Sequence, residues 1–207
     1  MYVPAHFAAP SDQSVTELLA QHGAADLVTT TDIGLLATFL PFIYDAAADQ
    51  LGTLRGHVAR NNDHWRRSAI GEALVIVRGP DAYVSPSWYT TKTDHGRVVP
   101  TWNYITAHVY GHLVVHDDVG WLEQVVRDLT AKHELGNPSP WSVDDPPAGY
   151  IAGQLRAIVG IEIKITRIEA KFKLSQNRPA ADIDGVIAAL DNDPTGAAMR
   201  LATRRIS

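Results

Sequence analysis

The chain has 207 residues, of which 45% are hydrophobic and 20% charged, as in an ordinary globular protein with one large domain or one domain with appendages. It contains no cysteine, which excludes disulfides, thiolate metal sites and iron–sulfur clusters held by thiolates. The net charge of −5 gives no overall basic footprint for DNA, and no apolar stretch approaches the ~20 residues that cross a bilayer. The start of the chain also lacks a signal-peptide pattern, so we expect a cytoplasmic protein with no membrane partner.

The first half of the chain alternates strand patterns with two helix patterns. Apolar residues at helical spacing predict a helix over residues 14–22, which Gly23 ends. Strand patterns follow over residues 27–30, 35–44 and 51–57, with turns predicted at 32–34 and 45–50. A second helix is predicted over residues 61–70, with Asn61 or Asn62 as its cap and with Trp65 and Ile70 available to the core.

The second half contains longer patterns. An apolar run over residues 73–77 predicts a central strand, with a turn at 79–81 and a continuation over 83–85. Residues 102–116 alternate as strands do, with a hairpin or bulge expected at Gly111. The clearest helix spans residues 118–135 and is followed by Gly136 as a C-cap. A loop is expected over 137–149, a strand over 158–168, and a helical tail from Ala181 that breaks near 193–194.

Many short strands with helices between and after them predict an α+β fold built around a barrel or a strongly curled sheet. The sequence contains no Gly-rich dinucleotide fingerprint, Walker phosphate loop, Gly-x-Ser-x-Gly elbow or His-Glu-x-x-His motif. His108, His112 and His116 share one parity of the long strand. Positions four apart on a strand are separated by ~13 Å, too far for one metal, so these histidines indicate a polar sheet face and no metal site.

Four segments combine aromatic, amide and cationic side chains. Residues 54–62 run from a strand into a predicted helix start, where backbone N–H groups and Arg60 suit a phosphate. Residues 83–89 and 99–104 hold aromatic and hydroxyl groups that suit a flat ring. Residues 171–179 carry three cations, a hydroxyl and two amides before a helix, which suits an anion. Each segment also has a structural interpretation, as a helix cap, as core or dimer-interface aromatics, or as a solvated basic loop.

The same segments resemble the PaiB-like family of FMN-binding negative transcriptional regulators. The resemblance rests on several motifs in series over nearly the whole chain: residues 1–4, 51–61, 79–80, 85–89, 99–104, 157–160 and 173–178. It implies a split β-barrel related to flavin reductases and pyridoxamine phosphate oxidase, in a homodimer with two cofactor sites at the subunit interface. Residues 1–175 would form the barrel domain. Residues 176–207 would form a helical extension packed on the barrel or on the dimer partner.

The resemblance also implies cofactor-binding residues for FMN, whereas no residue identifies itself as a catalytic acid or base. The phosphate side would include Arg60, Lys173, Ser175 and Arg178, and the ring would be bordered by Trp88, Thr101, Trp102 and Asn103. Further cofactor-binding candidates in the matching motifs are His57, Asn61, Ser85, Tyr89 and Gln176. In this interpretation the protein is a flavin-dependent redox enzyme or regulator that acts on a small-molecule substrate or ligand.

Two alternatives remain open at this stage. Some proteins of this type resemble haem-dependent piperazate synthases, which form an N–N bond, and His57 would then be the axial ligand of haem b. The family description also allows a repressor that binds DNA directly. The acidic charge and the absence of a recognisable helix-turn-helix count against DNA as a partner.

Overall fold

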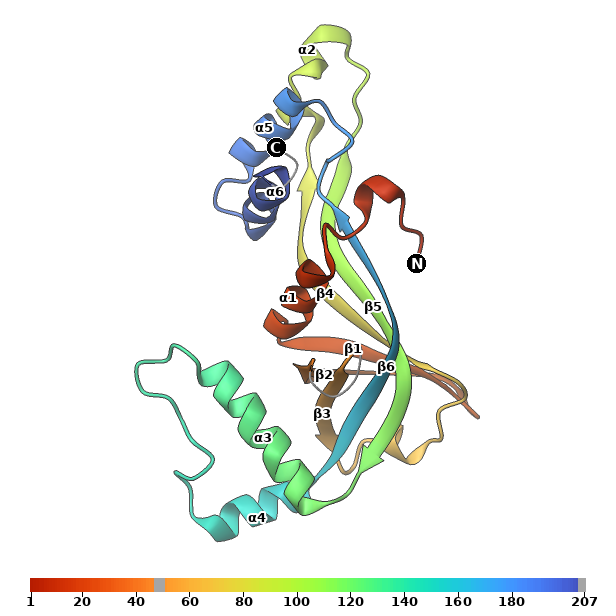
Figure 1. The fold of residues 1–207 in the computed structure, drawn as a ribbon, viewed down its shortest axis with the longest axis vertical. Helices are drawn as coiled ribbons and strands as arrows, with labels where there is room; N and C mark the ends of the chain where they lie inside the picture. Colours follow the sequence, from red (N-terminus) through yellow and green to blue (C-terminus); the bar gives the residue numbers. More distant parts are fainter. Residues whose placement is uncertain (47–50, 205–207) are drawn as a thin grey trace. The chain divides into compact units, whose positions relative to one another are not determined.

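The computed structural model describes residues 1–46 and 51–204 of the chain. Its six strands form a closed barrel in the order β1-β2-β3-β6-β5-β4, with helices before, between and after them (Figure 1). The strands are β1 (Ala24–Thr31), β2 (Gly34–Asp45), β3 (Thr53–Ala59), β4 (Ala73–Val84), β5 (Thr101–His116) and β6 (Ile158–Lys173). The α-helices are α1 (Asp12–Gln21), α2 (Thr91–His95), α3 (Val119–Glu134), α4 (Ala148–Arg156), α5 (Ala180–Ala189) and α6 (Pro194–Arg204), and the 3₁₀ turns are η1 (Ala5–Phe7), η2 (Asp63–Arg66) and η3 (Pro86–Trp88). The predicted α+β barrel is confirmed.

The chain divides into two compact units, each built from segments that are distant in the sequence. Unit 1 contains Met1–Val15, Arg78–Ala107 and the described chain from Glu169 onward, and unit 2 contains Thr16–Val77 and His108–Ile168. Strands β4, β5 and β6 each pass from one unit into the other. The domain boundary expected after residue 175 stays a prediction, and residues 205–207 of that extension lie outside the described residues.

Unit 2 owes its closed sheet to β1, which has a partner on each side. β1 pairs along its full length with β2 and pairs through Asp26–Val28 with Leu74–Ile76 of β4. β3 pairs with both β2 and β6, so its backbone groups are also used on both sides. Inward-facing residues alternate along these strands, and Leu27, Val75 and Ile161 are fully buried. α3 lies against β3, where the Arg55 Nη2 donates to the Asp128 Oδ2 over 3.0 Å.

Unit 1 is a smaller core formed by the remaining parts of the long strands and by α5 and α6. Val84, Val186 and Met199 are fully buried in it. α5 approaches η3 so closely that a Cβ added at Gly185 would lie 2.1 Å from the carbonyl oxygen of Trp88. The helical tail is confirmed, and its break is real because α5 ends at Ala189 and α6 begins at Pro194.

The strand predictions in the first half are confirmed, with ends that shift by a few residues. Residues 27–30, 35–44 and 51–57 correspond to β1, β2 and β3, and residues 14–22 correspond to α1. The predicted turn over 45–50 lies largely outside the described residues. Residues 118–135 correspond to α3, whose apolar stripe buries Leu122, Val125 and Leu129.

The hairpin, one of the two possibilities predicted at Gly111, is wrong, because β5 continues without interruption. Glycine is needed there for a close approach between strands. A Cβ on Gly111 would lie 2.3 Å from the carbonyl oxygen of Lys164 and 2.8 Å from the Ile163 Cγ2. The sequence pattern reveals that glycine is special at this position but not that the reason is packing across β6.

The turn predicted at Gly79–Asp81 is also wrong, because β4 continues through it. Before it the buried residues are Ala73, Val75 and Val77, and after it they are Ala82 and Val84. This change of parity along one strand is what a β-bulge produces. The register with β1 covers only Leu74–Ile76, so a proline further along does not interrupt that ladder.

The helix predicted over 61–70 is reduced to the short turn η2. His64 is buried, and its ring nitrogens each lie 2.8 Å from a threonine hydroxyl, of Thr29 on β1 and Thr38 on β2. The Ile70 N–H donates to the Thr30 carbonyl, which holds the following residues extended. Ile70 is 60% exposed and does not reach the core. Hydrogen bonds to the barrel therefore override the local helical preference.

α4 is missing from the sequence predictions, since its glycines at 149 and 153 weaken the helical pattern. His108 and His112 lie on the less buried face of β5, opposite the buried row of Ala107, Val109 and Gly111.

Within the described residues, no helix is long and apolar enough to cross a membrane.

We expect Gly111→Ala to lower the free energy of unfolding by roughly 1–3 kcal/mol, because the new methyl group would overlap the backbone of β6. Gly149→Ala is the matched control, since a Cβ there meets nothing within 4 Å and alanine favours the helix. Denaturant unfolding measures both. Equal stability of the Gly111 variant and the parent would contradict the close approach of β5 to β6.

Candidate functional site

The residues expected to bind the cofactor fall into two groups, one in each unit. Unit 1 contains ten of them: Ser85, Trp88, Tyr89, Thr101, Trp102, Asn103, Lys173, Ser175, Gln176 and Arg178. Unit 2 contains the other three: His57, Arg60 and Asn61.

Lys173, the last residue of β6, lies beside the first residues of β5. Its Nζ donates to the Thr101 Oγ1 over 2.7 Å and to the backbone carbonyl of Trp102. Burial lowers the pKa of Lys173 below its usual range, and the positive charges of Lys171 and Arg178 lower it further. The sequence motifs on β5 and after β6 are thus brought together around one ammonium group.

Lys171, Lys173 and Arg178 form a cation cluster. None of these three residues makes an ion pair with any carboxylate in residues 1–46 and 51–204. Lys171 is only 9% exposed, and its Nζ lies 5.5 Å from the ring centroids of both Tyr2 and Tyr104. Cation–π contacts compensate part of its lost hydration. Grouped positive charge without a carboxylate is the arrangement that an anionic ligand stabilises.

Trp102, the second residue of β5, presents a fixed aromatic surface at the same end of the strand as Lys173. Its indole Nε1 donates to the Asp81 Oδ1 over 2.9 Å, and its ring centroid lies 6.2 Å from that of Tyr83 in an edge-to-face arrangement. Trp102 is 49% exposed. A cavity of about 290 Å³ lies beside it, with Arg78 and Tyr104 among the other lining residues.

Asn103 and Ser175 bind each other inside unit 1. The Asn103 Nδ2 donates to the Ser175 Oγ over 2.9 Å and contacts the Met199 Sδ of α6 over 3.4 Å. Both residues are buried, and Ser175 has a positive φ of 67° that this contact helps to hold. Gln176 accepts from the Leu174 N–H and donates to the Phe172 carbonyl. These three side chains shape the turn after β6 that carries Arg178.

The segment around η3 is ordered by its own caps and by α5. Ser85 accepts from the Ser87 N–H, and Trp88 is half-buried. Tyr89 is 3% exposed, and the guanidinium carbon of Arg178 lies 4.8 Å from its ring centroid. Burial raises the pKa of Tyr89, and the nearby charge of Arg178 opposes that rise. Arg178 is therefore stacked on an aromatic ring at the edge of the cation cluster.

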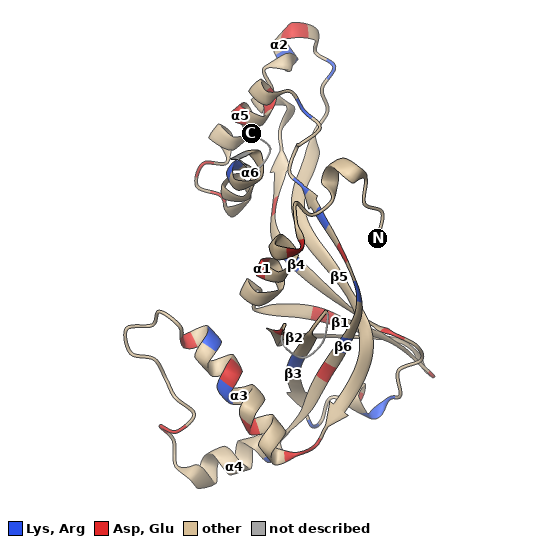
Figure 2. Cartoon of the chain, viewed as in Figure 1, with Lys and Arg blue, Asp and Glu red and all other residues tan. Residues whose placement is uncertain are grey.

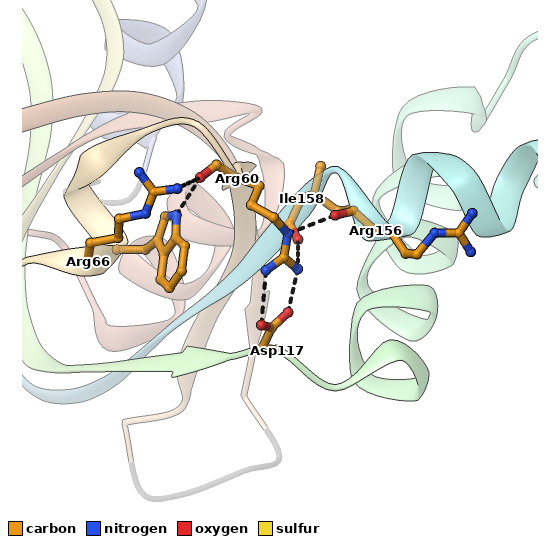
Figure 3. A network of polar contacts seen from close by, with 6 residues as sticks. Arg60, Arg66, Asp117, Arg156 and Ile158 are labelled. Carbon is orange, nitrogen blue, oxygen red and sulfur yellow. Dashed lines mark hydrogen bonds and ion pairs between the residues drawn. The ribbon is translucent and has the colours of Figure 1, made fainter.

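In unit 2, Arg60 is fully engaged by the protein (Figure 3). Its guanidinium makes a bidentate contact with Asp117, and it also donates to the backbone carbonyls of Arg156 and Ile158. The hydrogen bonds from Arg60 hold the pKa of Asp117 below its usual range. Asn61 is exposed, and it is Asn62 that accepts from the His64 N–H as the cap of η2. Arg60 thus joins the ends of β5 and α4 to β3.

His57 lies on β3 opposite Gly160 of β6. Its Nδ1 is buried without a hydrogen-bond partner in the described chain. Burial lowers the pKa of His57, so the imidazole is neutral near physiological pH. A neutral ring nitrogen without a hydrogen is a competent ligand for a metal ion or for haem iron.

Several functional candidates were absent from the sequence-based set. Lys171 belongs to the cationic segment 171–179 but was not assigned to the cofactor, although it shares the strand face of Lys173 two residues away. Asp81, Asp117 and Asp182 are carboxylates from distant segments, and only the tertiary structure pairs them with Trp102, Arg60 and the α2 threonines.

Asp182 fixes α5 to the start of α2. Its carboxylate accepts from the Thr90 hydroxyl and from the N–H and hydroxyl of Thr91, over 2.7–3.0 Å. Burial alone would raise its pKa, but these hydrogen bonds outweigh burial and hold the pKa of Asp182 below its usual value. The charged form therefore stabilises the segment that carries Trp88 and Tyr89.

We expect Asp182→Asn to lower the melting temperature by a few degrees near neutral pH, because an amide accepts these hydrogen bonds less well. The depressed pKa contributes stability above the unfolded-state value of 3.8, and that contribution is lost as pH falls through the folded-state pKa. The difference in melting temperature between the variant and the parent should therefore become smaller at acidic pH. Asp184→Asn, an exposed change on the same helix, is the control. A difference in melting temperature between Asp182→Asn and the parent that does not change with pH would argue against a charge effect.

Comparison with known proteins gives the family. Residues 1–167 match the family model described as "Putative FMN-binding domain". Protease synthase and sporulation protein PAI 2 of Bacillus subtilis is 32% identical over 205 residues, which cover 98% of this chain and 95% of that protein. Among solved structures, the flavocytochrome Anf3 of Azotobacter vinelandii has a TM-score of 0.61 at 13% identity, covering 83% of this chain and 72% of that one. The FAD and haem binding protein of Mycobacterium smegmatis has a TM-score of 0.53 at 18% identity, covering 87% and 78%.

The two structural likenesses support the same split-barrel fold, and the expected FMN agrees with the matched family. The chain belongs to the FMN-binding domain family, as a PaiB-like member.

Proposed function

We propose that this protein binds FMN as a homodimer and uses it to exchange electrons or hydride with a small molecule. The observation that carries the proposal is the cation cluster of Lys171, Lys173 and Arg178, which has no carboxylate partner in the described residues. Burial and, to a smaller extent, the charges of Lys171 and Arg178 lower the pKa of Lys173, and a phosphate dianion would offset both effects. The residues present therefore fit the phosphate end of FMN.

The aromatic surface of Trp102 fits the other end of such a ligand. Because Asp81 holds the indole N–H, the Trp102 ring has a fixed orientation beside the cavity. Bound FMN would supply a flavin ring that accepts or donates hydride. In this proposal Lys173 and Arg178 hold the phosphate, and Trp102 and Tyr104 limit the access of water to the ring.

The homodimer is part of the proposal because one chain offers an incomplete enclosure. The volume of the cavity, about 290 Å³, is slightly below the roughly 300–1,000 Å³ of typical small-molecule sites.

The outer face of the β1–β2 hairpin carries the exposed apolar residues Ile33, Leu35 and Phe39, at 61%, 74% and 70% exposure. A contiguous apolar face of this kind favours an interface, and we assign it to a second copy of the chain.

A haem enzyme is the second candidate, and His57 favours it. Burial lowers the pKa of its imidazole and its Nδ1 has no hydrogen-bond partner in the described chain, so His57 would supply a nitrogen ligand to haem iron. Direct DNA binding has less support, since the net charge is −5 and Figure 2 shows acidic and basic residues interspersed along α3. A regulatory role, like the cytoplasmic location expected from the sequence, stays a prediction.

We expect Lys173→Ala to weaken FMN binding about tenfold, because a charge-assisted contact to the phosphate is lost. Lys164→Ala, which removes an exposed lysine of the same strand outside the cluster, should leave the affinity unchanged. Flavin fluorescence titration measures both, and equal affinities of the two variants would refute the assignment. In a parallel hemin titration, a Soret band that disappears in His57→Ala would favour the haem candidate over FMN.

We expect Leu35→Glu and Phe39→Glu to shift the protein from dimer to monomer, because each places a charge in the apolar face of the hairpin. Leu135→Glu is the control, since Leu135 is 87% exposed at the end of α3 and outside that face. Sedimentation velocity distinguishes the two states. A parent protein that sediments as a monomer, or hairpin variants that remain dimeric, would refute this interface.

A further inference from the structure

Unit 2 contains a cavity that the FMN proposal does not use. It has a volume of about 400 Å³ and lies between the loop after η2 and the last residues of β5. Trp65, Arg66, Arg67 and Ser68 line one side, and His112 and Val115 line the other. No lining residue in the described chain is acidic. Its size falls within the range of small-molecule sites.

The two arginines of this cavity differ in how firmly they are already bound. Arg66 donates to the Arg60 carbonyl over 3.1 Å (Figure 3). It also donates to the Asp63 Oδ1 over 2.8 Å, so its guanidinium is held in place. The Arg67 Nη1 lies 3.6 Å from the Asp32 Oδ2, which is beyond hydrogen-bond distance, and the Asp32 side chain is 71% exposed. Such a contact contributes little, so Arg67 is available to another anion.

Further donors face the same space without partners of their own. The imidazole of His112 and the hydroxyl of Ser68 make no hydrogen bond with any residue that the structure describes. Together with Arg67 they offer a guanidinium, a ring N–H and a hydroxyl from two different segments. This combination matches the oxygens of a phosphate or carboxylate group.

Trp65 adds a flat wall to the cavity. Its Nε1 donates to the Arg60 carbonyl over 2.9 Å, and the guanidinium carbon of Arg66 lies 5.1 Å from the ring centroid. Both contacts fix the plane of the indole before any ligand arrives. A pre-oriented aromatic ring beside cationic donors suits a ligand that joins a ring to an anionic group.

We propose that this cavity binds a small anionic ligand with a planar ring, separately from FMN. The anionic group contacts Arg67, Ser68 and His112, and the ring lies against Trp65. The inference does not depend on the FMN site, whose proposed residues belong to unit 1. It gives the protein a second small-molecule site, as a substrate or an effector would require.

Calorimetric titration at low salt tests the proposal, with the full chain both free and saturated with FMN. The probes are adenosine monophosphate, benzoate and adenosine, which supply a ring with phosphate, a ring with carboxylate, and a ring alone. We expect at least one anionic probe to bind and adenosine to bind about tenfold more weakly or not at all. Arg67→Ala and His112→Ala should each lower the affinity for the anionic probe roughly tenfold. Arg156→Ala, which removes an exposed arginine of unit 2 outside the cavity, should have no effect.

Three results would overturn the proposal. The first is no binding of either anionic probe to the free or the FMN-saturated protein. The second is equal affinity in Arg67→Ala and Arg156→Ala. The third is a parallel loss of FMN affinity in Arg67→Ala, which would assign the cavity to the FMN site. Failure of FMN to bind at all would instead refute the proposed function, and the titration of the free protein would still decide this inference.

Discussion

Closure of the sheet through β1 is the constraint on which the rest of the barrel depends. β1 pairs with β2 along its length and with β4 through Asp26–Val28, so neither edge of the sheet is left open. Closure forces strands close together, and glycines mark the tightest points. Gly56 lies against the Pro41 carbonyl and Gly111 against the Lys164 carbonyl, where any side chain would overlap backbone. The positions of His57, Arg60 and His112 follow from these strands.

Polar contacts, buried at His64 and largely exposed at Arg60, attach the connecting segments to the barrel. His64 bonds to hydroxyls of Thr29 and Thr38, and Arg60 bonds to Asp117 and two backbone carbonyls. Because these groups are satisfied only in the native arrangement, they determine the path of the chain after β3. The same contacts leave Arg67 with only a distant carboxylate, which is why the cavity of unit 2 retains binding capacity.

Arginine and lysine residues in the predicted motifs have different roles, and their neighbours decide which. Arg60 is neutralised by Asp117, whereas Lys171, Lys173 and Arg178 have no carboxylate partner in the described chain. A guanidinium that already makes a bidentate pair with a carboxylate has few free donors left for an anionic ligand. A group of unpaired, partly desolvated cations is destabilising unless an anion binds. The positions of the carboxylates therefore decide, as much as the positions of the cations, which basic residues are assigned to a ligand.

The sequence by itself determined the α+β class, the strands of the first half, helix α3 and the broken helical tail, because alternation and helical spacing are local signals. Its motifs in series also identified the family. Only the tertiary structure decided that residues 61–70 form no long helix, since the partners of His64 lie 35 and 26 residues away along the chain. It likewise decided that β5 is unbroken at Gly111, which faces β6. For the site, local composition located the cationic and aromatic segments, but the pairing of Arg60 with Asp117 and of Asn103 with Ser175 depends on long-range contacts that no local pattern contains.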